Sequence, residues 1–486
     1  MPAIITNKFR IHNAEQFSES FSESSANVYY LFMGRPQDFG NSTDGAGATI
    51  TEGSEASPPT PNDDVSQEFY YFDDMLSAKR ITSSDVSYVI PRRNWTTGTV
   101  YDQYRDNYSS SVTASSGATN LWDSTFYVRS SANHIYKCLF NNSGAASTVE
   151  PTGTATTILT TGDGYKWKYM YSLSASQQIN FLSTDFMAVA TNSTVQAAAV
   201  DGALDTVLVT AGGSAYTTSG AADTGTITSV PIRGDGSSGV CTVTIASGAV
   251  TSVTVTTAGT GYTFGYITNA DIQAQGGGTG TGATFKVVIP PKNGHGYDAV
   301  KELGGFYVML NTNFEGTESS NTGDFTVAND FRRIGIVRDP TASSSALTAT
   351  TVRSTKAIKI TGASGSFTVD EEINQATTGA VGKVVEWDST NSILHYIQTR
   401  FADEGIDSNG NLTAFSGANV ITGQSSSVTG TPDTAYSSTA DQITFSSGYA
   451  SSEIDADSGD VIYVENRAKI TRAADQTENV KLVIEF

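Results

Sequence analysis

Hydrophobic and polar residues alternate over many short stretches of this chain, and this pattern predicts β-strands. Near the C-terminal end the apolar residues that recur at every second position are Val461, Tyr463, Val480, Leu482, Ile484 and Phe486. Residues at this period lie on one face of a strand. A charged connection from Asn466 to Asn479 separates the two runs. We therefore predict two strands that dock into a sheet and complete the fold.

The first 195 residues are rich in aromatic residues and mix strand patterns with helix patterns. The apolar run from Val28 to Met33 predicts a buried strand, and Val86 to Ile90 predicts another. Helical spacing of apolar residues predicts one helix from Asn13, its cap, to about Glu23. It predicts a second helix that begins after an Asp64 cap.

Two stretches are rich in small residues, with many Gly and Thr. Leu204 to Thr217 and Val250 to Thr263 share a pattern of alternating β-branched residues followed by small residues, Gly and Tyr-Thr. This is a twofold repeat with a period of about 45 residues, and two copies are too few for a solenoid. We expect them to form one small β-domain together. Ser345 to Pro432 predicts a second Gly/Thr-rich β-region with about five short strands.

These patterns predict a mainly β fold: a frame of strands with a few short helices and two small inserted β-modules. The frame is expected over residues 1–195, 293–345 and 438–486. The inserted modules are expected over residues 196–292 and 346–437.

Charge and composition narrow the function classes. The chain of 486 residues has a formal net charge of −21, which argues against general binding of nucleic acid, because phosphates need clustered Lys and Arg. It contains no apolar run of 18 residues and no signal-peptide pattern. We therefore expect that the protein is made in the cytoplasm and does not insert into a membrane. Cys138 and Cys241 have no neighbours at metal spacing and are expected to be free thiols.

No local motif predicts catalysis. The four histidines, His12, His134, His295 and His395, lie in no zinc-binding or catalytic-triad context. The Gly-rich loop Gly234–Gly239 lacks the Lys-Ser/Thr of a phosphate-binding loop and predicts a hairpin turn. We expect no enzyme activity, no cofactor and no metal site.

The sequence Pro91-Arg92-Arg93-Asn94-Trp95 follows a predicted strand. Two adjacent arginines beside a Trp can bind carboxylates bidentately or stack on the indole ring. An ordinary pair of solvated charges at a strand end is an equally good interpretation of this motif.

Six segments, in this order, resemble the gene product 8 family of baseplate wedge subunits from T-even-like contractile-tailed phages. They are Tyr29–Pro36, Pro58-Pro59, Val89–Trp95, Gly162–Tyr169, Asp330–Pro340 and Val461–Phe486. The most specific pieces are VIPRRNW, and VIYVENR followed by DQTE. The resemblance covers roughly residues 1–195, 295–345 and 440–486, and it omits both Gly/Thr-rich regions.

This resemblance implies a structural protein of the virion tail baseplate whose frame is a β-sandwich, without catalysis or cofactor. It implies a homodimer that joins other baseplate wedge proteins during tail assembly. The residues on the matching motifs are candidate contacts within the frame or with a neighbouring subunit: Arg92, Arg93, Trp95, Glu465, Asn466 and Arg467. Our hypothesis is that Arg92 and Arg93 bind buried carboxylates, with Glu465 and Asp475 as candidate partners.

Two other functions stay open on the sequence alone. Tyr216, Tyr262 and Trp387 lie on the predicted modules, where aromatic rings would stack on sugars of a host surface. The chain would then be a tail-associated glycan-binding module. A polysaccharide-degrading enzyme would need two carboxyl groups about 5–10 Å apart, and no motif points to such a pair.

Overall fold

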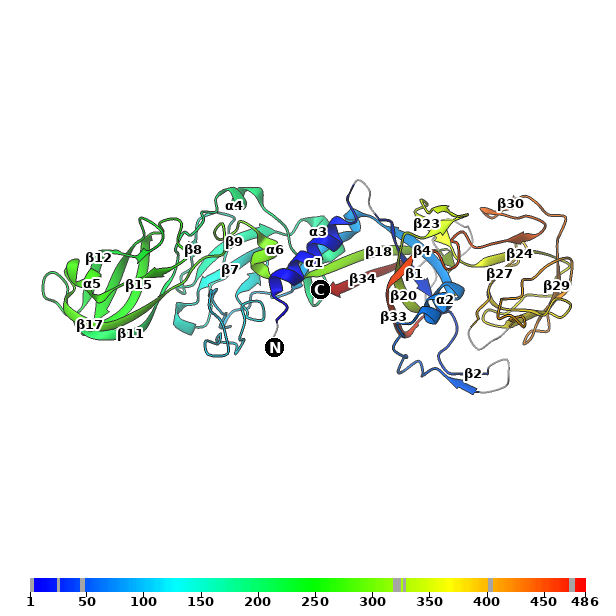
Figure 1. Ribbon diagram of the computed structural model, residues 1–486, viewed down its shortest axis with the longest axis horizontal. Coiled ribbons are helices and arrows are strands. Elements are labelled where there is room, and N and C mark those ends of the chain that lie inside the picture. Colours follow the sequence, from blue (N-terminus) through cyan, green and yellow to red (C-terminus); the bar gives the residue numbers. More distant parts are fainter. Residues whose placement is uncertain are drawn as a thin grey trace. The chain divides into compact units, whose positions relative to one another are not determined.

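The computed structural model describes residues 4–23, 27–43, 49–317, 325–326, 329–400, 405–471 and 477–486. The described residues form many strands and a few short helices (Figure 1), so the predicted mainly β class is confirmed. They divide into two compact units. The first unit contains Met1–Gln16, Ser87–Met309 and Val483–Phe486, and the second contains Phe17–Val86 and Leu310–Leu482. The sandwich arrangement and the module boundaries stay predictions.

The helices show how local signals set element ends. Helix α2 (Val65–Asp73) begins where predicted, because the Asp64 carboxylate accepts a hydrogen bond from the Gln67 N–H at 3.0 Å. The prediction for the first helix was wrong at its start. Helix α1 spans Asn7–Glu19, since the Thr6 hydroxyl accepts from the Phe9 N–H and caps the first turn instead of Asn13.

The remaining helices are short and all lie in the first unit: α3 (Ala175–Phe181), α4 (Ser193–Ala197), α5 (Asn269–Ala274) and α6 (Ala299–Leu303). Among the described residues no helix is both long and apolar enough to span a membrane. Cys138 and Cys241 are both free and buried.

A small sheet forms the centre of the first unit. Its strands, in spatial order, are β6 (Tyr127–Arg129), β7 (His134–Phe140), β9 (Lys166–Ser172) and β8 (Leu159–Thr160). Beside it, β10 (Phe186–Ala188) pairs antiparallel with β5 (Val86–Pro91). Strand β9 is buried on both faces. Trp167 belongs to one core cluster and Met170 to another, and Lys168 is buried as well.

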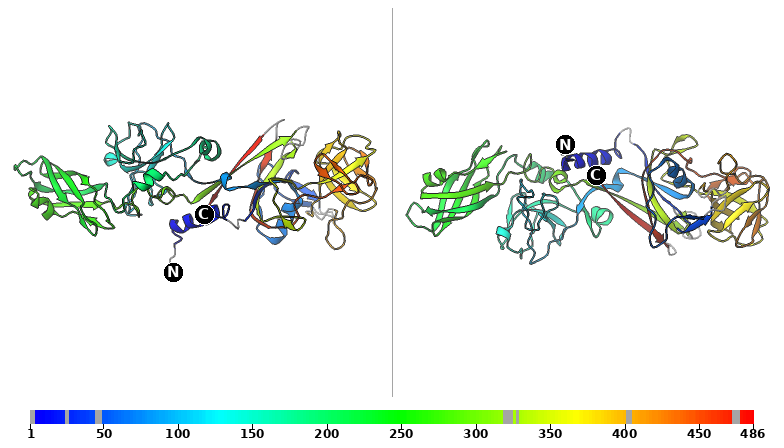
Figure 2. Two further views of the ribbon diagram at one scale, coloured as in Figure 1. Left: turned by 90° about the horizontal axis from the view of Figure 1, so that it is seen from above. Right: turned by 60° about the horizontal axis from the view of Figure 1, so that its bottom comes forward.

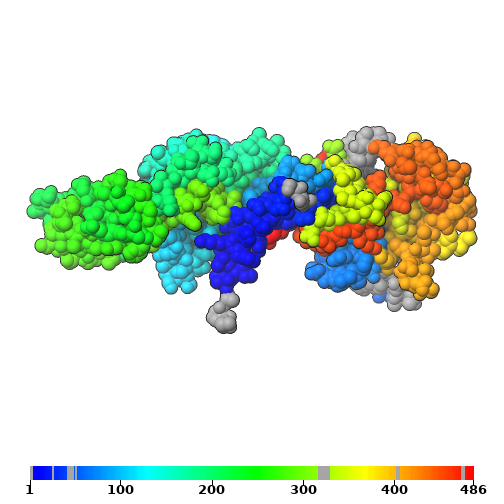
Figure 3. All heavy atoms as spheres, turned by 45° about the horizontal axis from the view of Figure 1, so that its top comes forward, coloured from blue at the N-terminus to red at the C-terminus, as the bar shows by residue number. Residues whose placement is uncertain are grey.

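The Gly/Thr-rich repeat of the first unit forms one sheet, as expected (Figure 2). Its order is β12 (Gly225–Pro231), β14 (Val240–Ala246), β15 (Ala249–Thr257), β11 (Val207–Tyr216) and β17 (Gly278–Val287). Strands β11 and β14 come from the first repeat, and β15 and β17 come from the second. The longest pairings join the two repeats, since β14 pairs with β15 and β11 pairs with β17. Each repeat therefore depends on the other, and the space-filling view shows the green residues as one continuous body (Figure 3).

The second unit is built around an antiparallel sheet in the order β23 (Thr351–Arg353), β4 (Met75–Ile81), β1 (Tyr29–Gly34), β20 (Phe331–Arg338) and β33 (Asp460–Ile470). Strand β1 is buried along its whole length, as its continuous apolar run predicts. The predicted C-terminal strands are confirmed as β33 and β34 (Thr477–Glu485). Strand β34 pairs with β18 (Tyr307–Thr317).

The second Gly/Thr-rich region forms a closed sheet in the second unit. Its order is β27 (Ile393–Ile397), β26 (Ala380–Asp388), β25 (Glu372–Gln375), β28 (Ile421–Gly423), β29 (Thr429–Pro432) and β24 (Lys356–Thr361), with β32 (Tyr449–Ala450) beside β24. Strand β24 pairs with β29 near its end and with β27 along its start. This double pairing closes the barrel, so the strands inside it have no open edge.

Candidate interaction site

The Arg-Arg-Asn-Trp motif lies at the end of β5, where main-chain bonds fix its course. The Arg92 N–H donates to the Asp185 carbonyl at 2.7 Å, and the Trp95 N–H donates to the Arg129 carbonyl at 2.9 Å. The Trp95 indole donates to the Ser147 hydroxyl at 3.1 Å and packs against a buried core cluster. The motif is therefore packed into the first unit and held there by hydrogen bonds.

The arginines of this motif bind carbonyl oxygens. Arg93 donates to the carbonyls of Ser124, Trp122 and Asp123, which belong to one turn, and its guanidinium lies 4.5 Å from the Tyr127 ring centroid. Arg92 donates to the Ser183 carbonyl at 2.8 Å and to Asn94 Oδ1 at 3.1 Å.

The expectation of carboxylate partners was therefore wrong for the contacts that these side chains make within their own unit. Neither Arg92 nor Arg93 forms an ion pair with any described residue of the first unit. A cation beside the carbonyl end of a turn is stabilised by the dipoles of those carbonyls, so no acid is needed there. Glu465 belongs to the other unit, and Asp475 lies outside the described residues.

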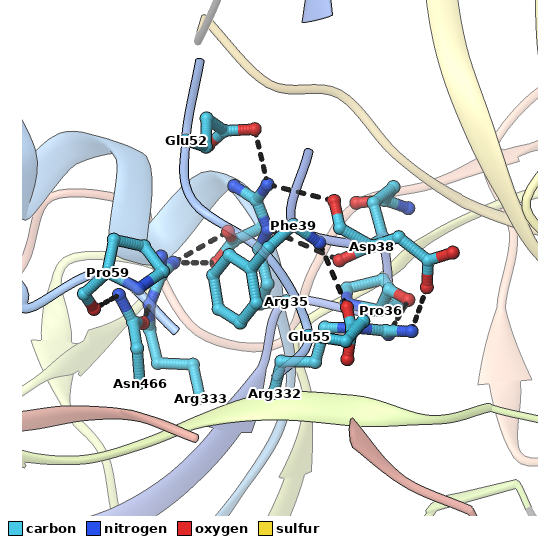
Figure 4. Close-up of polar contacts among 12 residues, drawn as sticks. Arg35, Pro36, Asp38, Phe39, Glu52, Glu55, Pro59, Arg332, Arg333 and Asn466 are labelled. Carbon is cyan, nitrogen blue, oxygen red and sulfur yellow. Dashed lines mark hydrogen bonds and ion pairs between the residues drawn. The ribbon is translucent and has the colours of Figure 1, made fainter. Parts of the chain in front are cut away.

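A second pair of adjacent arginines, Arg332 and Arg333, lies inside β20 and is met by acids (Figure 4). Arg333 Nη1 lies 2.6 Å from both carboxylate oxygens of Asp74, and its Nε donates to Asn466 Oδ1 at 3.0 Å. Both charged partners are more than nine-tenths buried. The Arg333 guanidinium also lies 4.7 Å from the Tyr71 ring centroid. This side chain joins β20, β33 and the end of α2.

Arg332 holds the loop that follows β1. It is 1% exposed and contacts the Asp38 carboxylate, the Pro36 carbonyl and, at 2.6 Å, Glu55 Oε1. Glu55 also accepts from the main-chain N–H groups of Phe39 and Lys469. Burial by itself would raise the pKa of Glu55, but the hydrogen bonds from Arg332 and these amides outweigh it and lower the pKa.

Arg35 completes this cluster. Its guanidinium pairs with Glu52 at 2.6 Å and lies over the Phe39 ring. Asn466, on the other side, donates to the Pro59 carbonyl at 3.0 Å. We call Arg35, Arg332, Arg333 and the acids that they bind the arginine cluster. A cleft of about 360 Å³ opens beside it, lined by Arg35, Glu52, Pro59, Tyr70, Asp74, Arg333 and Asn466.

The three candidate residues of β33 therefore have different surroundings. Asn466 contacts the arginine cluster, because it accepts a hydrogen bond from Arg333. Glu465 is half-buried and accepts from the Tyr463 hydroxyl at 3.0 Å, and burial, with this carboxylate nearby, raises the pKa of Tyr463 to about 12. Arg467 is half-buried, and no hydrogen bond joins it to the described residues. Their assignment as frame or subunit contacts stays a prediction.

The sequence interpretation missed Arg332 and Arg333, although they lie in one of the segments that carry the resemblance. The available signal was two arginines in a strand that continues with Ile, Gly, Ile and Val. Buried charges need partners, so a strand of this kind predicts acids elsewhere in the chain. Nothing in the local pattern says which acids they are.

The sequence interpretation also missed a cluster of buried ionisable side chains in the first unit. Lys137 is fully buried and pairs with Glu302, and His295 Nε2 lies 3.5 Å from Asp205 Oδ2. Burial raises the pKa of Asp205 to about 6, against the opposing effect of Lys168 and Lys137. Within the described residues, no group of three or more His, Cys, Asp or Glu side chains is arranged to hold a metal ion.

Two of the three aromatic residues proposed for sugar stacking are core residues. Tyr216 is 0% exposed and Tyr262 is 2% exposed. Their hydroxyls are used inside the protein, by Asn269 and by the Ile232 carbonyl. The prediction that these rings face a glycan was wrong, because the Tyr of each repeat closes the sheet core. Trp387 is half-buried and packs edge-on against Phe367.

Comparisons with known proteins agree with the resemblance of the motifs. The family model described as Bacteriophage T4, Gp8 matches residues 3–148, a range that includes the Arg92–Trp95 motif. The chain is also 23% identical over 214 residues to the baseplate wedge protein gp8 of Enterobacteria phage T4. That alignment covers 38% of this chain and 60% of the phage T4 protein. The predicted resemblance is confirmed: the chain is similar to the Gp8 family over residues 3–148 and to the phage T4 baseplate wedge protein over the aligned part.

Proposed function

We propose that this protein is a structural wedge subunit of a contractile phage tail baseplate. The match of residues 3–148 to the Gp8 family model is the observation that carries this proposal. The subunit is made in the host cytoplasm, forms a homodimer and joins neighbouring wedge proteins in the virion tail. It catalyses no reaction.

The two arginine pairs support a structural role. Arg93 gathers three carbonyls of one turn, and Arg332 and Arg333 fix a long loop and a helix end to the central sheet. Charged side chains used in this way hold surface loops in one conformation. Fixed loops lower the entropy cost when subunits associate.

Among the six candidate residues, we propose Arg467 as the subunit contact. It lies on β33, the last described strand at one edge of the central sheet of the second unit. Ile462, five positions earlier on the same strand, is 42% exposed. Unpaired edge strands are common places for association with another chain. Arg92, Arg93, Trp95 and Asn466 are then contacts that hold the frame.

Light scattering of the purified protein tests the proposal. We expect a particle of twice the 51.1 kDa chain mass, and a larger complex when wedge proteins of the same phage are added. Arg467→Glu should weaken one or both associations, while Lys8→Glu, an equal charge change on an exposed helix position, should weaken neither. A monomer that ignores the wedge proteins contradicts the proposed function.

A further inference from the structure

Two large aromatic side chains are exposed in the Gly/Thr-rich region of the first unit. Phe264 is 60% exposed and Tyr266 is 44% exposed. Tyr266 lies on strand β16 (Gly265–Tyr266), which forms a small two-stranded sheet of its own with β13, and Phe264 lies in the bend that leads into β16. Their ring centroids are 5.7 Å apart with an interplanar angle of 40°. The two rings thus form one continuous aromatic surface.

The backbone below these rings is firmly held. The Asp235 carboxylate accepts from the N–H groups of Thr263 and Phe264, at 3.0 and 2.9 Å. Strand β13 (Arg233–Gly234) pairs antiparallel with β16. A Cβ at Gly234 would lie 2.0 Å from the Phe264 carbonyl oxygen, so only Gly permits this close approach. A surface that is fixed before binding loses little entropy when a ligand arrives.

A planar charged pair borders the rings. Arg233 lies directly opposite Tyr266 in the strand pair, and cross-strand partners have side chains on the same face. Its Nε and Nη2 donate to Asp271 Oδ1 at 3.1 and 2.7 Å. The Arg233 side chain is 54% exposed and the Asp271 side chain is 10% exposed. Solvent-facing donors therefore lie beside the aromatic surface, and the charge of Arg233 is balanced by Asp271.

The surroundings decide which partner fits. The exposed neighbours of the rings along β13, β16 and their loops are small and polar, among them Ser237, Ser238, Thr260 and Thr263. A protein interface needs a wide apolar core, which two rings among hydroxyl groups do not supply. A charged ligand would need free charge, whereas here Arg233 is paired with Asp271, and both oxygens of the exposed Asp235 carboxylate already accept hydrogen bonds from Thr263 and Phe264. A sugar ring offers an apolar C–H face for stacking and a rim of hydroxyls for hydrogen bonds.

We propose that Phe264 and Tyr266 bind a neutral oligosaccharide by stacking, while Arg233 hydrogen-bonds the hydroxyls of the sugar. The surface is distinct from Tyr216 and Tyr262, which are buried in the core of the Gly/Thr-rich region. It does not depend on the proposed wedge function. A subunit of the tail would carry this site in addition to its structural role.

Isothermal titration calorimetry on the intact protein tests this proposal with maltohexaose, cellohexaose and N-acetylchitohexaose as probes. We expect at least one of them to bind. Phe264→Ala and Tyr266→Ala should each weaken that binding about tenfold, because each removes one stacked ring. Tyr266→Phe should keep most of the affinity, and Arg233→Ala should lower it. Tyr297→Ala, a 39% exposed aromatic residue outside the patch, should leave binding unchanged.

The proposal is overturned if none of the three oligosaccharides binds at millimolar concentration, or if binding survives in the Phe264→Ala/Tyr266→Ala variant. It is also overturned if that variant loses association with wedge proteins instead, since the patch would then be a protein contact. Light scattering reads the wedge association separately. A failed sugar titration therefore leaves the wedge proposal intact, and a failed association leaves the sugar site intact.

Discussion

The same dipeptide, Arg-Arg, occurs in both units and has a different role in each. At the end of β5, Arg92 and Arg93 are half-buried and bind main-chain carbonyls. Inside β20, Arg332 and Arg333 are 1% and 5% exposed and bind carboxylates. Full burial makes an unpaired charge very costly, so β20 needs acids, whereas a partly solvated cation is satisfied by the dipoles of a turn. Local sequence does not reveal this difference.

Among these arginines, the largest effect is expected at the buried ion pair of Arg333 with Asp74. Arg333→Ala leaves the Asp74 carboxylate buried without its partner, and we expect a loss of about 3–5 kcal/mol in unfolding free energy. Urea unfolding of the variant measures it. Arg333→Ala/Asp74→Ala should recover part of the loss, because it removes the orphaned charge as well. A loss below 1 kcal/mol for Arg333→Ala would contradict the contrast between the two pairs.

A smaller effect is expected for the carbonyl-binding arginine. Arg93→Ala removes a charged donor from the turn of Trp122, Asp123 and Ser124, and those carbonyls can be hydrated in its place. We expect a loss of about 1–2 kcal/mol. Arg93→Lys should restore only part of it, since an ammonium group cannot reach three carbonyls in the same fork geometry. If Arg93→Ala costs as much as Arg333→Ala, burial is not what separates the pairs.

Acid should weaken the arginine cluster through Glu55. Because the pKa of Glu55 is lowered in the folded state, its stabilising contribution is present above the pKa of the unfolded chain and is lost as the pH falls through the folded value. Glu55→Gln should therefore cost about 1 kcal/mol at pH 7, a value reduced by its partial exposure. The difference between the variant and the natural protein should shrink as the pH falls below the ordinary pKa range of a Glu side chain. Melting temperatures across this range check the trend, and a difference that grows on acidification contradicts it.

The smallest effect is expected at Arg92. Its two hydrogen bonds go to one carbonyl and to the exposed Asn94 side chain. Arg92→Ala should change the unfolding free energy by less than about 1 kcal/mol. Thermal unfolding beside Arg93→Ala gives the direct comparison of neighbours. A loss larger than that of Arg93→Ala would mean that Arg92 has a further partner, such as a neighbouring subunit.

The sequence predicted elements well where the signal was local. The apolar run at β1, the Asp64 cap of α2, the alternation in β33 and β34, and the twofold Gly/Thr repeat all appear as expected. These features depend on periodicity and on nearby side chains. The start of α1 failed because a closer cap, Thr6, competed with Asn13. Strand β9 is buried on both faces because two core clusters, one with Trp167 and one with Met170, pack against it, and its own sequence does not show this.

The sequence by itself determined the mainly β class, the expectation of a wedge-type relative, and the absence of a local catalytic motif. Only the tertiary structure decided which charges are buried and which aromatic rings are exposed. Asp74 meets Arg333 across more than 250 positions of the chain, and Tyr262 is buried while Phe264, two positions later, is exposed. Burial is set by packing between distant segments. Periodicity fixes the face on which a side chain lies, and the rest of the fold decides whether that face is covered.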